Sequence, residues 1–328
     1  MRKRTGEPIA RLKIVLILLA VAAVLTALYQ GGRWLERRAE KPEPQGDYQA
    51  RTNEETVTYD GVSYRRRRNV TAVLLLGIDN ESGEKGGQAD FLQLMVIDDT
   101  AKTVKRLALD RDTMTPIPVL DLRGKRAGVR TAQLSLSHGF GDGKEQSCAL
   151  TAEAASTLLG EPIDFYLAMN FDGIATLNDM AGGVTVTLAD NFSALDPEMV
   201  KGATLTLRGR QAEIFTRSRM SVGTGTNEAR MERQNQYLER LLPLLEDRLR
   251  NDQSFSGALL DALSPFLITD MSRGRLINAA WAAKDYVQPA PLSIAGVHQI
   301  GSDGFMQFYA DEDSLRRAVL ELFYEAIE

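Results

Sequence analysis

Four arginines lie close together in a stretch that is otherwise rich in glycine, serine and threonine. Although the whole chain carries a formal net charge of −5, residues 215–237 hold Arg217, Arg219, Arg230 and Arg233. A guanidinium group binds phosphate oxygens through two parallel hydrogen bonds. The stretch therefore suits a multiply charged anion such as pyrophosphate, with a surface network of ion pairs as the alternative explanation.

The arginines and one glutamine of this stretch are spaced to face the same anion. Arg217 and Arg219 point to one side if residues 214–220 are extended. Arg230 and Gln234 lie four positions apart, so they share one stripe of the long amphipathic helix that follows. Both lie near the first turns of that helix, where free N–H groups and the helix dipole favour negative charge.

Acidic residues are predicted to gather at one edge of a sheet. Residues 70–79 are a continuous apolar run of strand length, and two further strands are expected over 90–98 and 103–112. The short connections between the three favour antiparallel neighbours. In that arrangement four charged side chains meet where the strands begin or end: Asp79, Asp90, Arg111 and Asp112. Two aspartates without histidine are the hard oxygen ligands that Mg²⁺ takes. Each aspartate alone could equally cap a turn.

Helix and strand patterns alternate through the rest of the chain. Helices are expected over 146–159, 173–182 and 230–250, and a last helix over 312–327. The alternation predicts the α/β class, with helices on the faces of a mixed sheet. The expected division of the chain is a linker over 36–68, a catalytic domain over 69–250 and an extension over 251–328 packed on that domain.

The N-terminal part of the chain predicts a membrane anchor. Residues 14–29 are almost entirely apolar, and Trp34 suits the membrane interface that follows. We expect residues 1–13 to be a cytoplasmic tail, 14–35 a single transmembrane helix, and the remainder to lie outside the bacterial cell membrane. A cleaved signal peptide is the alternative, and it also exports the body of the protein.

Bulk composition narrows the class of protein. With 328 residues, 44% hydrophobic and 25% charged, the chain is globular and long enough for a sizeable core. A sequence pI near 5.4 argues against nucleic acid as a partner. A lone cysteine, Cys148, excludes an internal disulfide, and two histidines exclude a histidine-rich metal cluster.

Several blocks of sequence, in this order, resemble the LytR-CpsA-Psr family of bacterial envelope proteins. They are VLLLGIDN, ADFLQLMVID, LALDRDTM, QLSLSHGFGDG, LNDMAGGVTVTL, LRGRQAEIFTRSR and NEARMERQ, and the resemblance covers about residues 70–245. It implies a three-layer α/β/α sandwich. It also implies a Mg²⁺-dependent enzyme that moves an anionic glycopolymer, of teichoic acid or capsular type, from a polyprenyl-pyrophosphate carrier to peptidoglycan.

The resemblance further implies roles for individual residues. The acids linked to the metal are Asp79 and Asp90, and the catalytic pair is Arg111 and Asp112. The pyrophosphate contacts are Arg217, Arg219, Arg230 and Gln234. Two positions depart from the family pattern: Gln88 stands where an arginine is usual, and Gln133 is the candidate for the polar role in a block that usually contains lysine and asparagine.

Three other functions remain open from the sequence. The same site could hydrolyse polyprenyl pyrophosphates with water as the acceptor. The chain could instead bind wall polymers without turnover, as a regulatory membrane receptor or scaffold. A transcriptional attenuator, a label often attached to this family, is disfavoured because the body is exported and has no basic face for reading DNA.

Overall fold

The computed structural model describes residues 56–79, 86–121, 123–218, 222–252, 255–272, 275 and 286–327. The expected tail and anchor, residues 1–35, lie outside these ranges, and so does Arg219. None of the helices within these ranges is both long enough and apolar enough to cross a membrane.

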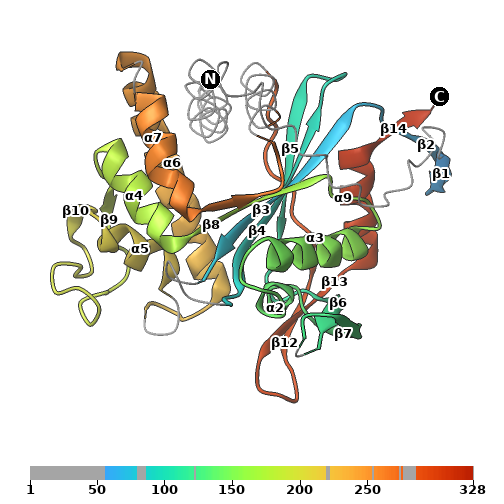
Figure 1. Ribbon diagram of the computed structural model, residues 1–328, viewed down its shortest axis with the longest axis horizontal. Coiled ribbons are helices and arrows are strands. Elements are labelled where there is room, and N and C mark those ends of the chain that lie inside the picture. The colour runs from blue at the N-terminus through green and yellow to red at the C-terminus, as the bar shows by residue number, and fades with distance from the viewer. Residues whose placement is uncertain are drawn as a thin grey trace, which may run out of the picture.

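The centre of the molecule is a five-stranded sheet in the order β11–β8–β3–β4–β5 (Figure 1). Its strands are β3 (Val70–Ile78), β4 (Ala89–Asp98), β5 (Thr103–Leu109), β8 (Phe165–Asn170) and β11 (Leu267–Thr269). The antiparallel order of β3, β4 and β5 is confirmed, while β8 runs parallel to β3. Both β3 and β4 lie in the middle of the sheet and are mostly buried, which agrees with the apolar run of β3 and the mainly apolar sequence of β4. The α/β class with a mixed central sheet is therefore confirmed.

Two helices pack on one face of this sheet, α3 (Glu145–Leu159) and α9 (Glu312–Phe323). Alternate side chains of β3, such as Leu74 and Leu76, share a hydrophobic core with Leu159 of α3 and Phe323 of α9. Asp311 caps α9 by accepting the N–H of Ser314. The helix predicted over 312–327 is too long, because its last residues leave the helix and form a strand.

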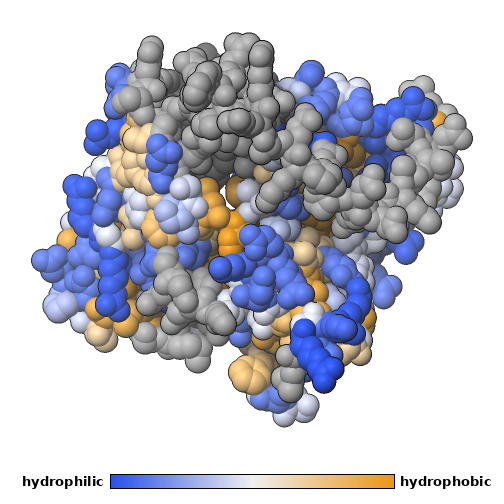
Figure 2. All heavy atoms as spheres, in the orientation of Figure 1, coloured by the Kyte–Doolittle hydropathy of each residue, from blue (hydrophilic) through white to orange (hydrophobic). Residues whose placement is uncertain are grey.

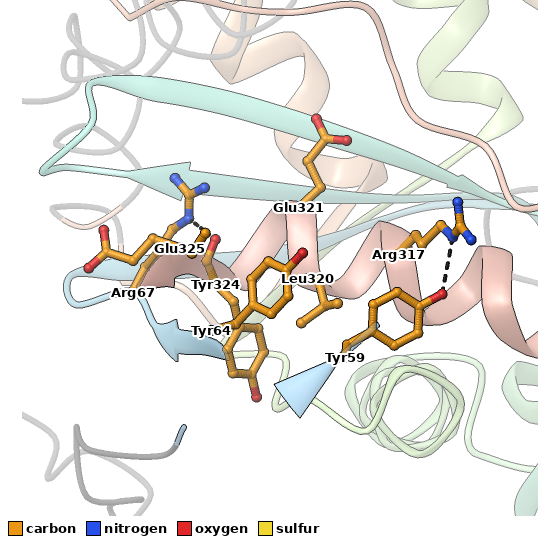
Figure 3. A pocket seen from close by; sticks show the side chains of 9 residues that line it. Tyr59, Tyr64, Arg67, Arg317, Leu320, Glu321, Tyr324 and Glu325 are labelled. Atoms are coloured by element: carbon orange, nitrogen blue, oxygen red, sulfur yellow. Dashed lines mark hydrogen bonds between the residues drawn. The ribbon is translucent and has the colours of Figure 1, made fainter. Parts of the chain in front are cut away.

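That strand is β14 (Tyr324–Ile327), which joins β1 (Thr56–Tyr59) and β2 (Val62–Arg66) in a separate sheet. Residues 56–66 fall in the expected linker, and here the structure differs from the expectation. The charges are not simply solvated: Arg66 pairs with buried Glu161 at 3.1 Å, and Arg67 pairs with Asp98 at 3.3 Å. An open cavity of about 340 Å³ lies between this sheet and α9 (Figure 3).

A second hydrophobic core lies beyond the β8 side of the sheet, where four helices gather (Figure 1). They are α4 (Phe171–Ala181), α5 (Arg210–Arg217), α6 (Asn227–Asn251) and α7 (Phe255–Leu263), with the ribbon of β9 (Thr185–Thr187) and β10 (Thr204–Thr206). Phe192, Phe215 and Leu241 are fully buried here. This core fixes the arginine-bearing ends of α5 and α6 relative to the central sheet.

Two β-hairpins lie side by side at the far end of β5 (Figure 1). One is β6 (Met114–Leu120) with β7 (Arg126–Gln133), and the other is β12 (Gly296–Ile300) with β13 (Met306–Ala310). A β-bridge between Thr113 and Phe308 joins them, and the short helix α2 (Leu136–Gly139) follows β7. The loop from β5 to β6, which holds Arg111 and Asp112, is thus enclosed by both hairpins.

Candidate active site

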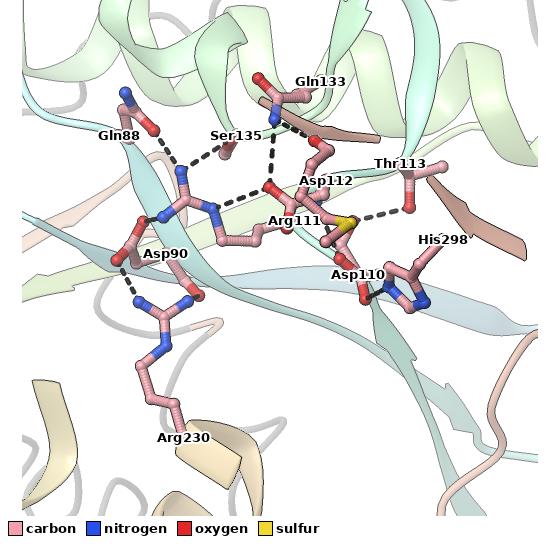
Figure 4. Close-up of polar contacts among 11 residues, drawn as sticks. Gln88, Asp90, Asp110, Arg111, Asp112, Thr113, Gln133, Ser135, Arg230 and His298 are labelled. Atoms are coloured by element: carbon pink, nitrogen blue, oxygen red, sulfur yellow. Dashed lines mark hydrogen bonds and ion pairs between the residues drawn. The ribbon is translucent and has the colours of Figure 1, made fainter. Parts of the chain in front are cut away.

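Asp90 lies between two arginines, Arg230, which is buried, and Arg111, which is mostly buried (Figure 4). At the start of β4, its Oδ1 pairs with the guanidinium of Arg111, and its Oδ2 lies 2.5 Å from Nη1 of Arg230. Only 8% of Asp90 and 2% of Arg230 is exposed. A buried charge needs close partners of opposite sign, and here two cations share one anion. The three side chains therefore form a compact group with net positive charge.

The orientation of Arg111 is set by its other neighbours (Figure 4). Gln88 Oε1 accepts a hydrogen bond from Nη2, and Ser135 Oγ accepts a second at 3.4 Å. Asp112 Oδ1 lies 3.4 Å from Nε. Asp110 shapes the loop by accepting the N–H of Asp112 at 2.8 Å. Gln88 thus holds Arg111 in place from the position where the resemblance noted above implies an arginine.

Arg217 supplies a more accessible cation at the same edge. Its guanidinium forms an ion pair with Asp79, which follows the end of β3, and each side chain is 35% exposed. It also donates to Glu213 at 2.9 Å and lies 5.0 Å from the centre of the Phe171 ring. Burial alone would lower the pKa of Arg217, but the hydrogen bond to Glu213 and the charge of Asp79 together raise it.

Two residues of the arginine stretch, Arg217 and Gln234, have surroundings that the sequence did not predict. Arg217 belongs to the last turn of α5 and not to an extended segment, because the apolar positions Ile214 and Phe215 pack into the second core. Gln234 contacts the backbone of α5, whereas Arg230 contacts Asp90. Its side chain donates to the carbonyl of Thr216 at 3.1 Å and so supports the end of α5.

Gln133 lies beside the predicted catalytic pair. Its Nε2 donates to Asp112 Oδ1 at 3.2 Å and to the carbonyl of Met306 at 2.5 Å. The side chain therefore links β7, the loop from β5 to β6 and β13. Asp79, Asp90, Arg111, Asp112 and Gln133 are all brought to one edge of the sheet, in contact with Arg217 or Arg230 or with each other.

Two neighbouring residues were missed from the sequence. Arg233, only 7% exposed, donates to the carbonyls of Phe215 and Ser218 and lies 3.4 Å from Asp190, so it braces the end of α5. Its place in the arginine stretch was a signal for this role. His298 of β12 lies 3.0 Å from Asp110, and nothing in the sequence links these positions.

A divalent cation fits part of this donor set. Asp79 Oδ1 is buried and receives no hydrogen bond, although the Arg217 guanidinium lies next to it. Both oxygens of Asp90 already face guanidinium groups. Among the described residues no three His, Cys, Asp or Glu side chains converge as a metal cluster. The carboxylates available to a divalent cation at this edge are therefore Asp79 and Asp90, and both are also paired with arginines.

Apolar surface adjoins the charged edge. Figure 2 shows hydrophobic side chains in the hollow at the middle of the molecule. In Figure 1, which has the same orientation, the strands of the central sheet lie at this place. Buried guanidiniums attract phosphate oxygens, and an apolar hollow suits a hydrocarbon chain. The fold and site together define a mixed α/β protein with a cluster of arginines and aspartates at one edge of its central sheet.

The chain belongs to the LytR_cpsA_psr family, whose model matches residues 38–319. Two curated relatives are polyisoprenyl-teichoic acid–peptidoglycan teichoic acid transferases named TagU. That of Halalkalibacterium halodurans is 26% identical over 61% of this chain and 60% of its own. That of Bacillus licheniformis is 29% identical over 52% and 51%. The chain thus spans only half to three-fifths of the length of these relatives.

Solved structures share the fold. Protein gbs0355 from Streptococcus agalactiae superimposes with a TM-score of 0.62 at 22% identity, covering 77% of this chain and 87% of its own. TagT bound to LIIa-WTA gives 0.56 at 20% identity, covering 78% and 90%. TagV of B. subtilis gives 0.54 at 23% identity, covering 78% and 97%.

Proposed function

We propose that this protein transfers an anionic glycopolymer, of teichoic acid or capsular type, from a polyprenyl-pyrophosphate carrier to peptidoglycan. The observation that carries this is the meeting of Arg217 with Asp79 and of Arg111 and Arg230 with Asp90 at one sheet edge. The family and the activity named for its TagU relatives support it. Arg219 and Gln234 were expected to join the same anion, and Arg219 remains a candidate contact.

The arginines are the main catalytic groups in this scheme. Arg111, Arg217 and Arg230 bind the diphosphate and stabilise the charge that develops on the leaving polyprenyl phosphate. A peptidoglycan hydroxyl attacks the phosphorus attached to the polymer. A new P–O bond to that hydroxyl forms, the bond to polyprenyl phosphate breaks, and the hydroxyl proton passes to a carboxylate, for which Asp112 is the candidate. The product is a phosphodiester and free polyprenyl phosphate.

Asp79 and Asp90 are the residues that would hold Mg²⁺ or a similar divalent cation in this scheme. When bound, such a cation supplies positive charge against the diphosphate oxygens. Asp90 also orients Arg111 and Arg230. It therefore contributes to anion binding through these two arginines even when no cation is bound. Asp79 does the same for Arg217.

We also propose the remaining parts of the plan: an anchor over 14–35, an extracytoplasmic catalytic domain of α/β/α type over 69–250, and an extension over 251–328. The extension contributes β11 to the central sheet and β13 to the loop that holds Asp112. These contacts support the proposal that the extension packs on the same domain. The apolar hollow next to the arginines suits the isoprene units of the carrier, at about 25 cal/mol per Å² buried.

Product analysis tests the function. The full chain is incubated with a lipid-linked glycopolymer, with and without peptidoglycan. Polymer joined to peptidoglycan by a phosphodiester is expected, and Arg217→Ala should lower the rate by about a hundredfold or more. Arg210→Ala, an exposed arginine in the first turn of the same helix, is the matched control and should leave the rate unchanged. Cleavage of the carrier without peptidoglycan would indicate a hydrolase, and binding without turnover a regulatory protein.

A further inference from the structure

A fully buried histidine lies directly behind the segment that carries Gln88. His138 belongs to the short helix α2, its exposed fraction is 0%, and the reaction proposed above does not use it. Its Nδ1 lies 2.9 Å from the carbonyl oxygen of Gly87, a residue 51 positions away in the sequence. A buried polar ring with a partner so distant in the sequence indicates a residue that fixes one segment of the chain against another.

The surroundings of the ring determine which nitrogen carries the hydrogen. A carbonyl oxygen only accepts, so Nδ1 donates to Gly87. Nε2 lies 3.9 Å from the Sγ atom of buried Cys148. Burial lowers the pKa of His138 below its ordinary value, and this effect outweighs those of the Gly87 carbonyl and of Asp142, which raise it. The ring is therefore neutral at pH 7, and its single N–H is the one that contacts Gly87.

The carbonyl that accepts this hydrogen bond adjoins a residue of the candidate active site. Gly87 directly precedes Gln88, whose side-chain oxygen accepts a hydrogen bond from Arg111 (Figure 4). Arg111 is in turn paired with Asp90, so its guanidinium cannot follow a moving partner. Because hydrogen bonds weaken steeply when their geometry changes, a shift of the backbone at Gly87 would break the alignment. His138 thus sets the position from which Gln88 reaches Arg111.

The residue that caps α2 holds the same group from a second side. The N–H of Ser135 donates to the carbonyl of Arg111 at 3.0 Å, and its own carbonyl accepts the N–H of Ala89 at 3.2 Å. Ser135 Oγ also accepts from the Arg111 guanidinium at 3.4 Å. Ser135 and His138 are only three positions apart. One short segment therefore contacts both the loop from β5 to β6 and the residues at the start of β4.

The loop that follows α2 packs directly on the backbone next to Gly87. Gly143 has a φ of +76°, and a Cβ atom at this position would lie 2.7 Å from the backbone nitrogen of Gly86. A side chain at position 143 would thus push Gly86 and Gly87 away from the ring of His138. The absence of a side chain here lets the two segments approach closely enough for the hydrogen bond to form.

We propose that His138 is a positioning residue for the reaction: its N–H fixes the backbone at Gly87 and so holds Gln88 against the guanidinium of Arg111. This role rests on the proposed function only in taking a diphosphate as the ligand of Arg111. His138 is not a catalytic residue, since its ring is fully buried and acts on the site only through Gly87 and Gln88.

Two variants of nearly equal shape separate positioning from stability. The side chains of Asn and Leu have the same branching and similar size, but only Asn offers an N–H near the place of Nδ1. His138→Asn should therefore keep the contact with Gly87, and His138→Leu should lose it. Leu159→Ala is the control for a general loss of stability, because Leu159 is buried in the same core at the other end of α3.

The first measurement needs no turnover. Titration calorimetry of the full chain with farnesyl diphosphate gives a Kd for a soluble diphosphate. His138→Leu should raise this Kd about tenfold, the value of a hydrogen bond to a charged group, while His138→Asn and Leu159→Ala leave it close to the unmodified value. Gln88→Ala should have the same effect as His138→Leu. The double variant should be no worse than either single one, because both act through one contact.

The second measurement needs no ligand. Hydrogen exchange of the amides of residues 88–90, followed by mass spectrometry, reports whether the backbone next to Gly87 is held in place. His138→Leu should accelerate this exchange about tenfold, and His138→Asn should leave it nearly unchanged.

Equal Kd values for His138→Asn and His138→Leu would overturn the proposal, and so would additive effects in the double variant with Gln88→Ala. Unchanged exchange in His138→Leu would show that Gly87 is held without the ring. If the unmodified protein binds farnesyl diphosphate but transfers no glycopolymer, the proposed function fails, while the higher Kd of His138→Leu than of His138→Asn still supports the positioning role.

Discussion

Arg230 on α6 neutralises Asp90 on β4 across 140 positions of the sequence. The contact joins the long helix of the second core to the central sheet, and both side chains are buried. It also fixes the charge of the site, because Asp90 shares its other oxygen with Arg111. One ion pair therefore holds two parts of the fold together and orients the groups proposed to bind the diphosphate.

Arg230→Ala should destabilise the protein by about 3 kcal/mol, since it leaves a buried carboxylate with one partner in place of two. Urea denaturation followed by circular dichroism measures this. The double variant Asp90→Asn with Arg230→Ala should lose clearly less unfolding free energy than the two single variants added together. The reason is that it removes the buried carboxylate and its buried cation at the same time. Additive losses would mean that the pair contributes no coupling energy.

Gln88→Ala should lower kcat/KM for transfer by about tenfold, the value of a hydrogen bond to a charged group. The amide oxygen orients the guanidinium of Arg111, and an unanchored Arg111 would lose its alignment with the phosphate. Steady-state kinetics with the lipid-linked donor measure the effect, and Gln299→Ala on exposed β12 is the control. An unchanged rate would show that Arg111 needs no support from this position.

His298→Ala should lower kcat more than it raises KM for the donor, because His298 acts on the catalytic loop through Asp110. A loss of roughly fivefold is expected for a part-exposed hydrogen bond. His298→Gln, whose amide can reach Asp110, should restore most of the rate. A purely structural role would instead lower thermal stability in both variants and leave kcat of the folded fraction intact.

The central part of this architecture follows from local sequence pattern. Continuous apolar runs identify β3 and β4, and their short connections place Asp79 and Asp90 at one edge. Arg111 and Asp112 follow because β5 ends next to them. This prediction used only the period and length of the apolar segments and the length of the turns between them. All three can be recognised within a few neighbouring residues.

Features that depend on partners far away in the sequence could not be predicted from local pattern. β1 and β2 resemble a solvated linker because their arginines gain partners, such as Glu161, only when the chain has folded. The sequence of β14 continues the helical pattern of α9, and it forms a strand only because it pairs with β2. Gln234 and Arg233 donate to carbonyl groups of α5. Their spacing in the sequence would be the same if they bound an anion, so it could not predict this role.

Arg233→Ala should expose the segment after α5 to proteolysis. Its guanidinium holds the carbonyls of Phe215 and Ser218, so its loss frees the chain just beyond Arg217. Cleavage by trypsin near this point should accelerate about tenfold in native conditions, as expected for a local opening about 1.4 kcal/mol easier. The exposed Arg240→Ala on the same helix is the control. Equal cleavage rates would show that the second core alone holds the segment.

Because of Cys148, the free energy of unfolding of the protein should decrease at alkaline pH. Burial raises the pKa of its thiol from 9.0 to about 12, with nearby carboxylates such as Asp142 adding to the effect. Since the folded pKa lies above the unfolded one, the stabilising contribution is complete below pH 9 and declines as the pH rises from 9 toward 12. The difference in unfolding free energy between the unmodified protein and Cys148→Ala should fall by about 1.4 kcal/mol per pH unit in that window. Urea denaturation at pH 7.5 and at pH 10 measures it. A constant difference, or rapid reaction of the native thiol with a disulfide reagent at pH 8, would show that Cys148 ionises as an exposed thiol does.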